Sequence, residues 1–135
     1  MRVLVTGAGG FIGAQLLALL HRQGHVGGRR IEVLAAADQR LGTLPAGVVA
    51  LEGDLGGEEV LARIAALAPE LCFHLAAVPG GAAEADPPLS RRVNLDATLN
   101  LFDTLAAAGT GTTAPVVVYA STIAVYGSAL PEVVT

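Results

Sequence analysis

Residues 6–13 read Thr-Gly-Ala-Gly-Gly-Phe-Ile-Gly, directly after the apolar run 3–5 and directly before an amphipathic segment. This order indicates a strand, a tight turn and the start of a helix. Gly7 permits the turn, Gly10 lets the backbone approach a ligand, and Gly13 allows helix and strand to pack closely. Because free N–H groups at a helix N-terminus attract anions, the run predicts a seat for a dinucleotide pyrophosphate. Glycine-rich turns also occur for folding reasons alone, so further motifs in the chain are needed to distinguish a nucleotide site from a structural turn.

Strand-like and helix-like segments alternate along the chain, which is typical of a parallel sheet with helices on its faces. We expect strands at 3–6, 31–38, 48–52, 71–76 and 115–121, helices at 12–20, 58–68 and 89–108, and loops at 24–30 and 78–88. The strand at 115–121 is apolar throughout, as expected at the centre of a sheet. The fold class is therefore α/β: a doubly wound, Rossmann-like domain over residues 1–135, incomplete at its C-terminal end.

All three predicted helices carry apolar stripes; that of the helix at 58–68 is Val60, Ile64 and Leu67. In the first helix we expect a stripe of Ile12, Leu16, Leu19 and Leu20. The helix at 89–108 has one stripe of Leu89, Val93, Ala97, Leu101 and Leu105, and a second of Leu95, Leu99, Phe102 and Ala106. A helix that is apolar on two sides is expected to be buried on two sides, so the second stripe requires a partner besides the sheet.

The composition limits the possible classes of function. The chain has 135 residues, is 53% hydrophobic and carries a net charge of −4, without the basic patch that nucleic-acid binding requires. It shows no signal-peptide pattern and no apolar stretch of about 18 residues, so we expect a cytoplasmic protein without a membrane span. The single cysteine, Cys72, lies in an apolar run and is expected to be buried and inert. No metal site is predicted.

Asp38 closes the second predicted strand, at roughly the distance from the glycines where a dinucleotide fold meets the adenosine ribose. A carboxylate there accepts hydrogen bonds from the ribose hydroxyls and repels a 2′-phosphate, so NAD is favoured over NADP. The alternative interpretation is a surface acid at a strand end. Arg40 lies nearby and partly offsets the charge, which leaves NADP as the less favoured cofactor.

Five motifs follow one another along the chain. They are Thr6-Gly7-x-x-Gly10-x-x-Gly13, Gly53-Asp54-Leu55, His74-Leu75-Ala76-Ala77, Asn94 with Asn100, and Ser121-Thr122-x-Ala124-Val125-Tyr126-Gly127. Together they resemble the extended short-chain dehydrogenase/reductase family, in its epimerase and dehydratase branch, over essentially the whole chain. Within that family, residues 81–98 are most similar to the D-erythronate dehydrogenase group, which oxidises a four-carbon sugar acid with NAD.

The resemblance implies cofactor-binding roles at the matching positions. Phe11 and Ile12 would line the pyrophosphate beside the three glycines. Asp54 would accept a hydrogen bond from the adenine amino group, and Leu55 would donate one through its backbone. Leu75, Ala76 and Ala77 would border the adenine-side ribose and the path toward the nicotinamide.

The remaining motif residues have competing interpretations. Thr122 falls where the family has its catalytic Ser or Thr, after Ser121, and its hydroxyl would bind the reacting substrate oxygen. The alternative for Thr122 is an ordinary cap or turn hydroxyl. Asn94 either ties its helix to the neighbouring strand, which we favour slightly, or contacts the ligand pocket. We expect His74 to be a hydrogen-bonded histidine at a strand end.

The family's general base is a tyrosine with a lysine four residues later, and this chain contains no lysine. Tyr119 and Tyr126 are followed at that distance by Ile123 and Leu130. We therefore expect the chain to be the cofactor-binding part of a longer enzyme, and to be inactive alone.

The resemblance implies that the full-length enzyme oxidises a sugar-acid carbinol by hydride transfer to NAD. A nucleotide-sugar epimerase or dehydratase and a non-catalytic NAD-binding module are the alternatives. The second stripe of the helix at 89–108 is expected to lie in a homodimer interface of the full-length protein.

Overall fold

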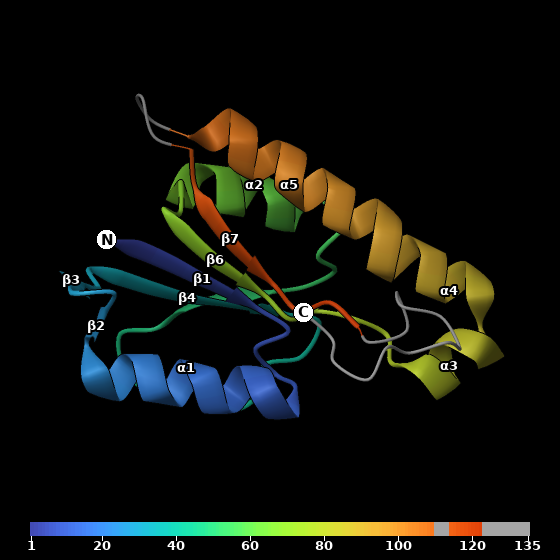
Figure 1. Cartoon of the computed structure of the whole chain (residues 1–135), viewed down its shortest axis with the longest axis horizontal. Coiled ribbons are helices and arrows are strands. Elements are labelled where there is room, and N and C mark those ends of the chain that lie inside the picture. Colours follow the sequence, from blue (N-terminus) through green and yellow to red (C-terminus); the bar gives the residue numbers. More distant parts are fainter. Residues whose placement is uncertain (110–113, 123–135) are drawn as a thin grey trace, which may run out of the picture.

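The computed structural model describes residues 1–109 and 114–122, which form a parallel sheet with helices on both faces (Figure 1). The sheet has the order β5-β4-β1-β6-β7, from β1 (Arg2–Thr6), β4 (Val33–Asp38), β5 (Val49–Glu52), β6 (Leu71–His74) and β7 (Val116–Tyr119). The chain runs outward from β1 to β5 and then returns to β6 on the other side of β1. This reversal between β1 and β6 is the place where open α/β sheets bind ligands, outside the carboxyl ends of the strands.

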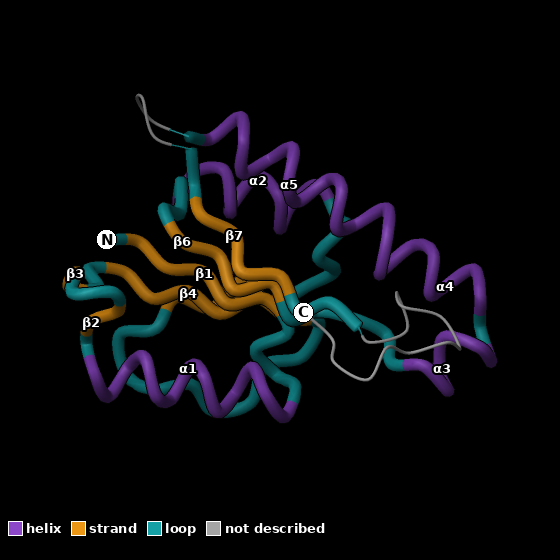
Figure 2. Tube along the Cα trace, viewed as in Figure 1, coloured by secondary structure: helices purple, strands orange, loops and turns teal. Residues whose placement is uncertain are grey.

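The helices form one layer on each face of the sheet, as Figure 2 shows. Helix α1 (Phe11–Gln23) covers one face, and α2 (Glu58–Leu67) and α5 (Ala97–Ala108) cover the other. Helix α4 (Pro87–Arg91), the π-helix η1 (Arg92–Asp96) and α5 run on as one long helical segment that extends past the sheet. None of the helices in the described part of the chain is long and apolar enough to cross a membrane.

Alternating residues of β1 supply the two halves of the core. Leu4 packs with Ile64, Leu101 and their neighbours beneath α2 and α5. Val3 and Val5 pack on the opposite face, with residues of α1. Successive strand residues point to opposite faces, so a strand that is apolar at every position is buried on both sides.

The predicted stripe of α1 is confirmed at Leu16 and Leu20, which pack in the core, and wrong at its other two positions. Gly13, Leu17 and Leu20 are buried, whereas Ile12 is 67% exposed and Leu19 also reaches the surface. The cause is Gly13, since a Cβ there would collide with the carbonyl oxygen of Gly7. This close approach sets the rotation of the helix, and the buried side therefore runs through residues 13, 17 and 20.

Both predicted loops contain regular structure, and those predictions were wrong. Residues 24–30 include a small antiparallel hairpin of β2 (His25–Val26) and β3 (Arg29–Arg30). Residues 78–88 include α3 (Gly80–Ala85) and the start of α4. Asp86 caps α4 by accepting a hydrogen bond from Leu89 N at 3.0 Å, and prolines occupy the first turn. An acidic cap followed by proline is a typical helix start.

The strand β7 forms an edge of the sheet in the described residues, not its centre as predicted. Val116, Val118 and Tyr119 are exposed. Val117 packs toward the core beneath α2 and α5, so the exposed Val116 and Val118 lie on the opposite face of the strand.

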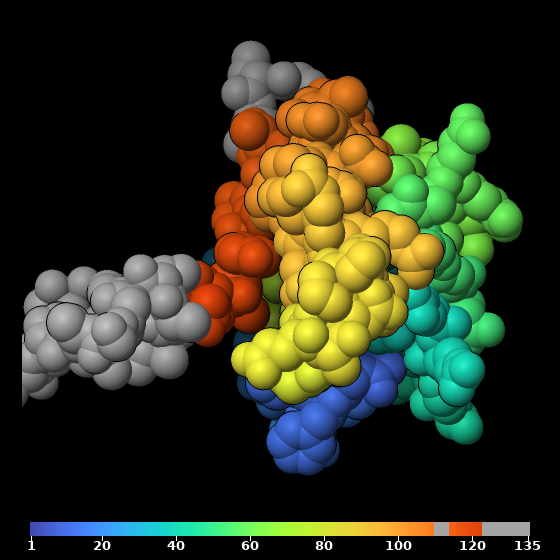
Figure 3. Space-filling model, turned by 90° about the vertical axis from the view of Figure 1, so that its right-hand side faces the viewer, coloured from blue at the N-terminus to red at the C-terminus, as the bar shows by residue number. Residues whose placement is uncertain are grey.

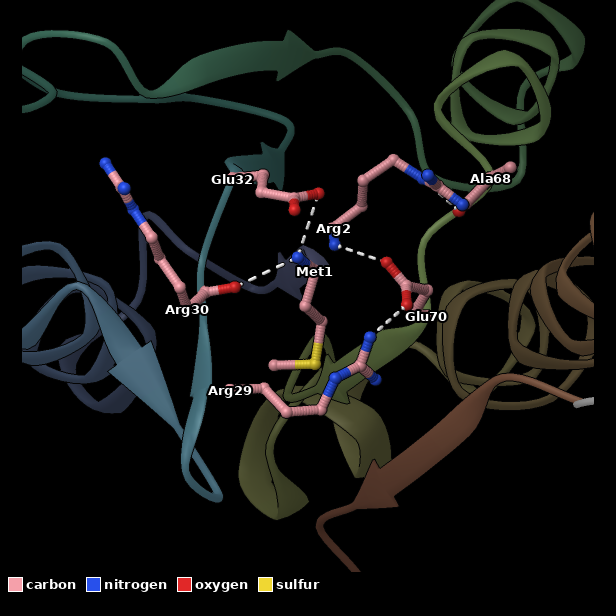
Figure 4. Close-up of polar contacts among 7 residues, drawn as sticks. All are labelled: Met1, Arg2, Arg29, Arg30, Glu32, Ala68 and Glu70. Carbon is pink, nitrogen blue, oxygen red and sulfur yellow. Dashed lines mark hydrogen bonds and ion pairs between the residues drawn. The ribbon is translucent and has the colours of Figure 1, made fainter.

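The amino end of the sheet is fixed by two groups of polar contacts (Figure 4). In the first group, the ammonium of Met1 donates to Arg30 O at 2.9 Å and lies 3.0 Å from Glu32 Oε2. These contacts attach the hairpin to the start of β1.

In the second group, the carboxylate of Glu70 accepts from Arg2 N at 2.9 Å and from Arg29 Nη2 at 2.6 Å. Arg2 Nε donates to Ala68 O at 2.7 Å. The bond from Arg29, followed by that from Arg2, lowers the pKa of Glu70 to about 2. These contacts lie at the amino end of the sheet, and the glycine turn lies at the opposite, carboxyl end.

Candidate functional site

A cleft of about 260 Å³ opens at the carboxyl ends of β1, β4 and β6. Figure 3 views this end of the molecule, with the start of α1 in blue, the segments after β4 and β5 in cyan and green, and α3 and α4 in yellow. The residues predicted to bind the cofactor that line the cleft are Gly7, Gly10, Asp38, Asp54, Leu55, Leu75, Ala76 and Ala77. The glycine turn and the segments that follow β4, β5 and β6 therefore meet where the strand order reverses.

The glycine turn is tight enough to exclude side chains. Gly7 has φ +68°, and a Cβ there would lie 2.6 Å from the carbonyl carbon of Leu75. Gly10 N donates to Gly7 O at 3.0 Å, which closes the turn before α1 begins. Only glycine adopts this conformation and proximity without strain.

Asp38 is attached directly to this turn. Its Oδ2 accepts from Gly9 N at 3.0 Å, and its Oδ1 accepts from Arg40 N at 3.4 Å. A Cβ on Gly9 would collide with Arg40 O, so this glycine is also required. Sequence reasoning missed Gly9, although the adjacent glycine pair at 9 and 10 was a visible signal. A carboxylate has about four acceptor positions, so Asp38 retains capacity for hydroxyl donors.

The segment after β5 forms a second wall. Asp54 Oδ1 accepts from Gly56 N at 3.0 Å, which turns the chain toward α2, and the rest of the Asp54 side chain is exposed. Leu55 is buried and contributes to the core as well as to the cleft. This wall offers a carboxylate beside an apolar surface.

The segment 75–78 after β6 forms the third wall and is held from two sides. Thr6 Oγ1 accepts from Leu75 N at 3.3 Å and from Ala76 N at 3.4 Å. On the other side, Asn94 Oδ1 accepts from Val78 N at 2.7 Å, and Asn94 Nδ2 donates to Val78 O at 3.0 Å. Asn94 thus ties its helix to this segment and does not itself line the cleft.

The long helical segment supplies an apolar wall of the cleft. Its residues belong to the stripe that was expected to pack on the sheet. Ala97 is buried, but Leu89 and Val93 lie beyond the sheet and line the cleft. Their spacing of four residues was visible, but the length by which the helix extends past the sheet was not. The π-helix η1 lies in this part, and π-helical turns occur frequently at functional sites. Ala37, Gln39 and Val78 complete the lining and were also missed.

Phe11 and Ile12 do not line the cleft. Their side chains are 85% and 67% exposed at the start of α1. Gly13 is buried beneath the turn. Any contact of these three residues with a pyrophosphate would come from their backbone, and it stays a prediction.

Ser121 and Thr122 follow β7, are exposed and are not among the lining residues. The rest of their motif, residues 124–127, lies outside the described residues. The catalytic role predicted for both hydroxyls is therefore untested.

Burial favours the neutral form of two titratable groups on β6, His74 and Cys72. His74 lies 2.7 Å from Thr6 Oγ1 through Nδ1 and 3.0 Å from Thr98 Oγ1 through Nε2, so the prediction of a hydrogen-bonded histidine is confirmed. Burial lowers the pKa of His74 and raises the pKa of the Cys72 thiol to about 12. Cys72 is therefore a packed thiol and not a nucleophile. The described residues contain no group of three or more His, Cys, Asp or Glu side chains that could hold a metal ion.

Comparison with known proteins gives one consistent family. The profile of the NAD dependent epimerase/dehydratase family matches residues 3–134. D-erythronate dehydrogenase of Cupriavidus necator is 40% identical over 141 aligned residues, which cover 99% of this chain and 42% of that protein.

Solved structures agree with this match. The nucleoside-diphosphate-sugar epimerase from Agrobacterium tumefaciens is 34% identical with a TM-score of 0.85, over 97% of this chain and 40% of that chain. MoeE5 in complex with UDP-glucose and NAD is 34% identical with a TM-score of 0.75, over 96% of this chain and 39% of that chain. The chain thus spans about two fifths of the length of these relatives.

Proposed function

Because the chain belongs to the NAD dependent epimerase/dehydratase family, we propose that it is the NAD-binding part of a dehydrogenase acting on a sugar acid. The chain spans 42% of the D-erythronate dehydrogenase that it matches, so the activity belongs to a protein of that length. The bond between Gly9 N and Asp38 is the observation that carries the proposal, since it joins the phosphate turn to the ribose acceptor.

Different residues of the cleft bind different parts of the cofactor. The backbone of residues 7–13 receives the pyrophosphate, where a glycine turn leads into the N-terminus of α1. Asp38 accepts from the adenosine ribose, and Asp54 with Leu55 borders the adenine. Leu75, Ala76 and Ala77 guide the nicotinamide half toward the substrate. The bound cofactor supplies the hydride acceptor.

Thr122 binds the substrate hydroxyl that loses its proton, with Ser121 beside it. The chain contains no lysine, so it holds no tyrosine–lysine pair that could act as the base. We assign that base to the portion of the enzyme that corresponds to the rest of the relatives' length. The chain alone is then expected to bind NAD without turnover.

The substrate class rests on the 40% identity with D-erythronate dehydrogenase. The likeness to a nucleoside-diphosphate-sugar epimerase supports a second candidate, in which the hydride returns to the same nucleotide-sugar substrate. The two candidates differ in whether NADH accumulates.

Calorimetric titration of the chain with NAD and NADP tests the cofactor assignment. We expect NAD to bind at least about tenfold more tightly than NADP, since a 2′-phosphate would face the Asp38 carboxylate. Asp38→Asn should lower NAD affinity by about 10- to 100-fold, because a charged acceptor contributes about 1.5–3 kcal/mol. Asp103→Asn removes an exposed charge on α5 and serves as the control. Unchanged NAD affinity in Asp38→Asn would reject the ribose assignment.

A chimera tests the catalytic assignment. In it, this chain replaces the matching part of the Cupriavidus necator D-erythronate dehydrogenase. We expect it to form NADH from D-erythronate, and Thr122→Val to lower kcat about 100-fold while NAD affinity is unchanged. Thr122→Ser should retain most of the activity. Equal kcat in the valine variant would show that Thr122 has no catalytic role. Conversion of UDP-glucose to its epimer without net formation of NADH, in a parallel assay, would favour the epimerase candidate.

A further inference from the structure

His74 connects the elements that carry two walls of the cleft. Its ring is buried at the end of β6, between Thr6 of β1 and Thr98 of α5. Tyr119 stacks on the ring at 5.5 Å between centroids, and Phe102 meets its edge at 5.8 Å. Both ring nitrogens and the ring plane are therefore fixed.

The hydrogen-bond pattern determines which nitrogen carries the proton. Thr6 Oγ1 accepts from Ala76 N at 3.4 Å and from Leu75 N at 3.3 Å, and Leu75 N is shared with Thr6 O at 3.2 Å. These two donors occupy the lone pairs of the hydroxyl. The only hydrogen-bonding capacity left to this hydroxyl is its own hydrogen, which points to His74 Nδ1 at 2.7 Å. Nδ1 is then an acceptor, and Nε2 carries the hydrogen and donates to Thr98 Oγ1.

We propose that His74 is a positioning residue, which as the neutral Nε2–H tautomer holds Thr6 in place so that the glycine turn and residues 75–76 keep the arrangement that binds the cofactor. Gly7 follows Thr6 directly and packs against the Leu75 backbone, so a shift of the Thr6 hydroxyl reaches both walls. The cofactor part of this inference rests on the proposed function.

Protonation of His74 would break this arrangement. An imidazolium has hydrogens on both nitrogens, so Nδ1–H would face the Thr6 hydroxyl hydrogen. Either the ring moves or the Thr6 hydroxyl releases the amides of Ala76 and Leu75, of which Leu75 N keeps its bond to Thr6 O. Cofactor binding and proton binding at His74 therefore oppose each other, and binding should weaken at acid pH.

The charges near the ring are few in the described part of the chain. Besides His74, the titratable side chains on β6 and β7 are the Cys72 thiol, whose pKa burial raises to about 12, and the Tyr119 phenol. On α5 the carboxylate of Asp103 is exposed, and on β1 the guanidinium of Arg2 lies at the amino end, bound to Ala68. Burial alone accounts for the lowered pKa of His74.

The pH dependence of NAD affinity tests the proposal by calorimetry between pH 5 and 8. Below the pKa of His74, affinity should fall toward a limit of tenfold per pH unit, the slope for one linked proton. His74→Asn offers a carbonyl oxygen near the position of Nδ1 and cannot protonate, so it should retain binding at pH 8 without that acid fall. His74→Leu should lose at least about tenfold, and His21→Asn, at an exposed histidine, should keep the wild-type profile.

Nitrogen NMR of the unsubstituted chain gives a second measurement that needs neither the cofactor nor a folded variant. We expect ring shifts of the Nε2–H tautomer and amide signals of Leu75 and Ala76 that titrate together with the ring. An Nδ1–H tautomer, or a titrating ring without movement of these amides, would overturn the proposal. If NAD fails to bind at every pH, the proposed function fails, and the NMR result alone decides whether His74 holds Thr6.

Discussion

Single glycines determine how close the turn and Asp38 can approach each other. Gly13 touches Gly7, and Gly9 touches Arg40, so an added methyl group has no space at either position. Gly13→Ala should lower the free energy of unfolding by about 1–3 kcal/mol, the usual cost of overpacking, and should weaken NAD binding. Gly42→Ala, where nothing lies within 4 Å, is the control and should change stability by less than about 0.5 kcal/mol. Equal denaturation midpoints for Gly13→Ala and Gly42→Ala would contradict the assigned close contact.

The Glu70 carboxylate gives stability its pH dependence at the amino end of the sheet. Its pKa is about 2 in the folded chain against an ordinary value of 4.5. A carboxyl group whose pKa is lowered by folding stabilises the fold at pH values above its pKa in the unfolded chain. This contribution is lost as pH falls from 4.5 toward 2. Glu70→Gln should therefore be less stable than the unsubstituted chain at pH 7, and the difference should shrink by pH 3. Urea denaturation at both pH values measures it, with Glu59→Gln as control; a pH-independent difference would argue against the pair with Arg29.

At the scale of elements, Asn94 connects the π-helix η1 to the wall at 75–78. Asn94→Ala removes both bonds to Val78, and leaving these partly buried backbone groups unpaired costs about 1 kcal/mol, the low end for buried groups. We expect lower stability and about tenfold weaker NAD binding, because the wall loses its support. Asn100→Ala changes an exposed amide on the same helical segment and should leave both quantities unchanged. NAD affinity is measured by calorimetry and the free energy of unfolding by denaturation. Equal values of both for the two variants would refute this role of Asn94.

The sequence predicted elements well where local patterns determine them. Apolar runs located all five strands of the sheet. The glycine spacing and the acid at the second strand end located Gly7, Gly10 and Asp38 of the cleft, and the family resemblance supplied the other five predicted residues that line it. The errors had two sources. The close contact at Gly13 rotated α1 away from the stripe of Ile12 and Leu19 and is tertiary. Asp86 with its prolines is a local helix start that was overlooked inside a predicted loop. The roles of Leu89 and Val93 depended on how far the long helix extends past the sheet, which no local pattern shows.

At the scale of the whole molecule, an apolar surface remains uncovered. Leu95 and Leu99, from the second predicted stripe, are 44% and 52% exposed. Tyr119 of β7 is also exposed, on the face of the sheet where it meets Phe102 of α5. Apolar patches of this kind mark interaction sites. This agrees with the expected second partner and supports, as a proposal, a homodimer through residues 89–108.

Oligomeric state tests that proposal. We expect the chain to associate in sedimentation experiments, and Leu95→Gln with Leu99→Gln to shift it toward the monomer while denaturation stays cooperative. Glu84→Gln, an exposed change on α3, should not alter association. A stable monodisperse monomer before any substitution would count against the interface.

The most direct test of the NAD site is amide NMR of the chain during titration with NAD. Binding at the proposed cleft should shift signals of residues 7–13, Asp38, 54–55 and 75–78. The signals of Arg29, Arg30 and Glu70, at the opposite end of the sheet, should stay in place. Shifts confined to that opposite end, or no shifts at millimolar NAD, would contradict the assignment of the glycine turn and Asp38 as the cofactor site.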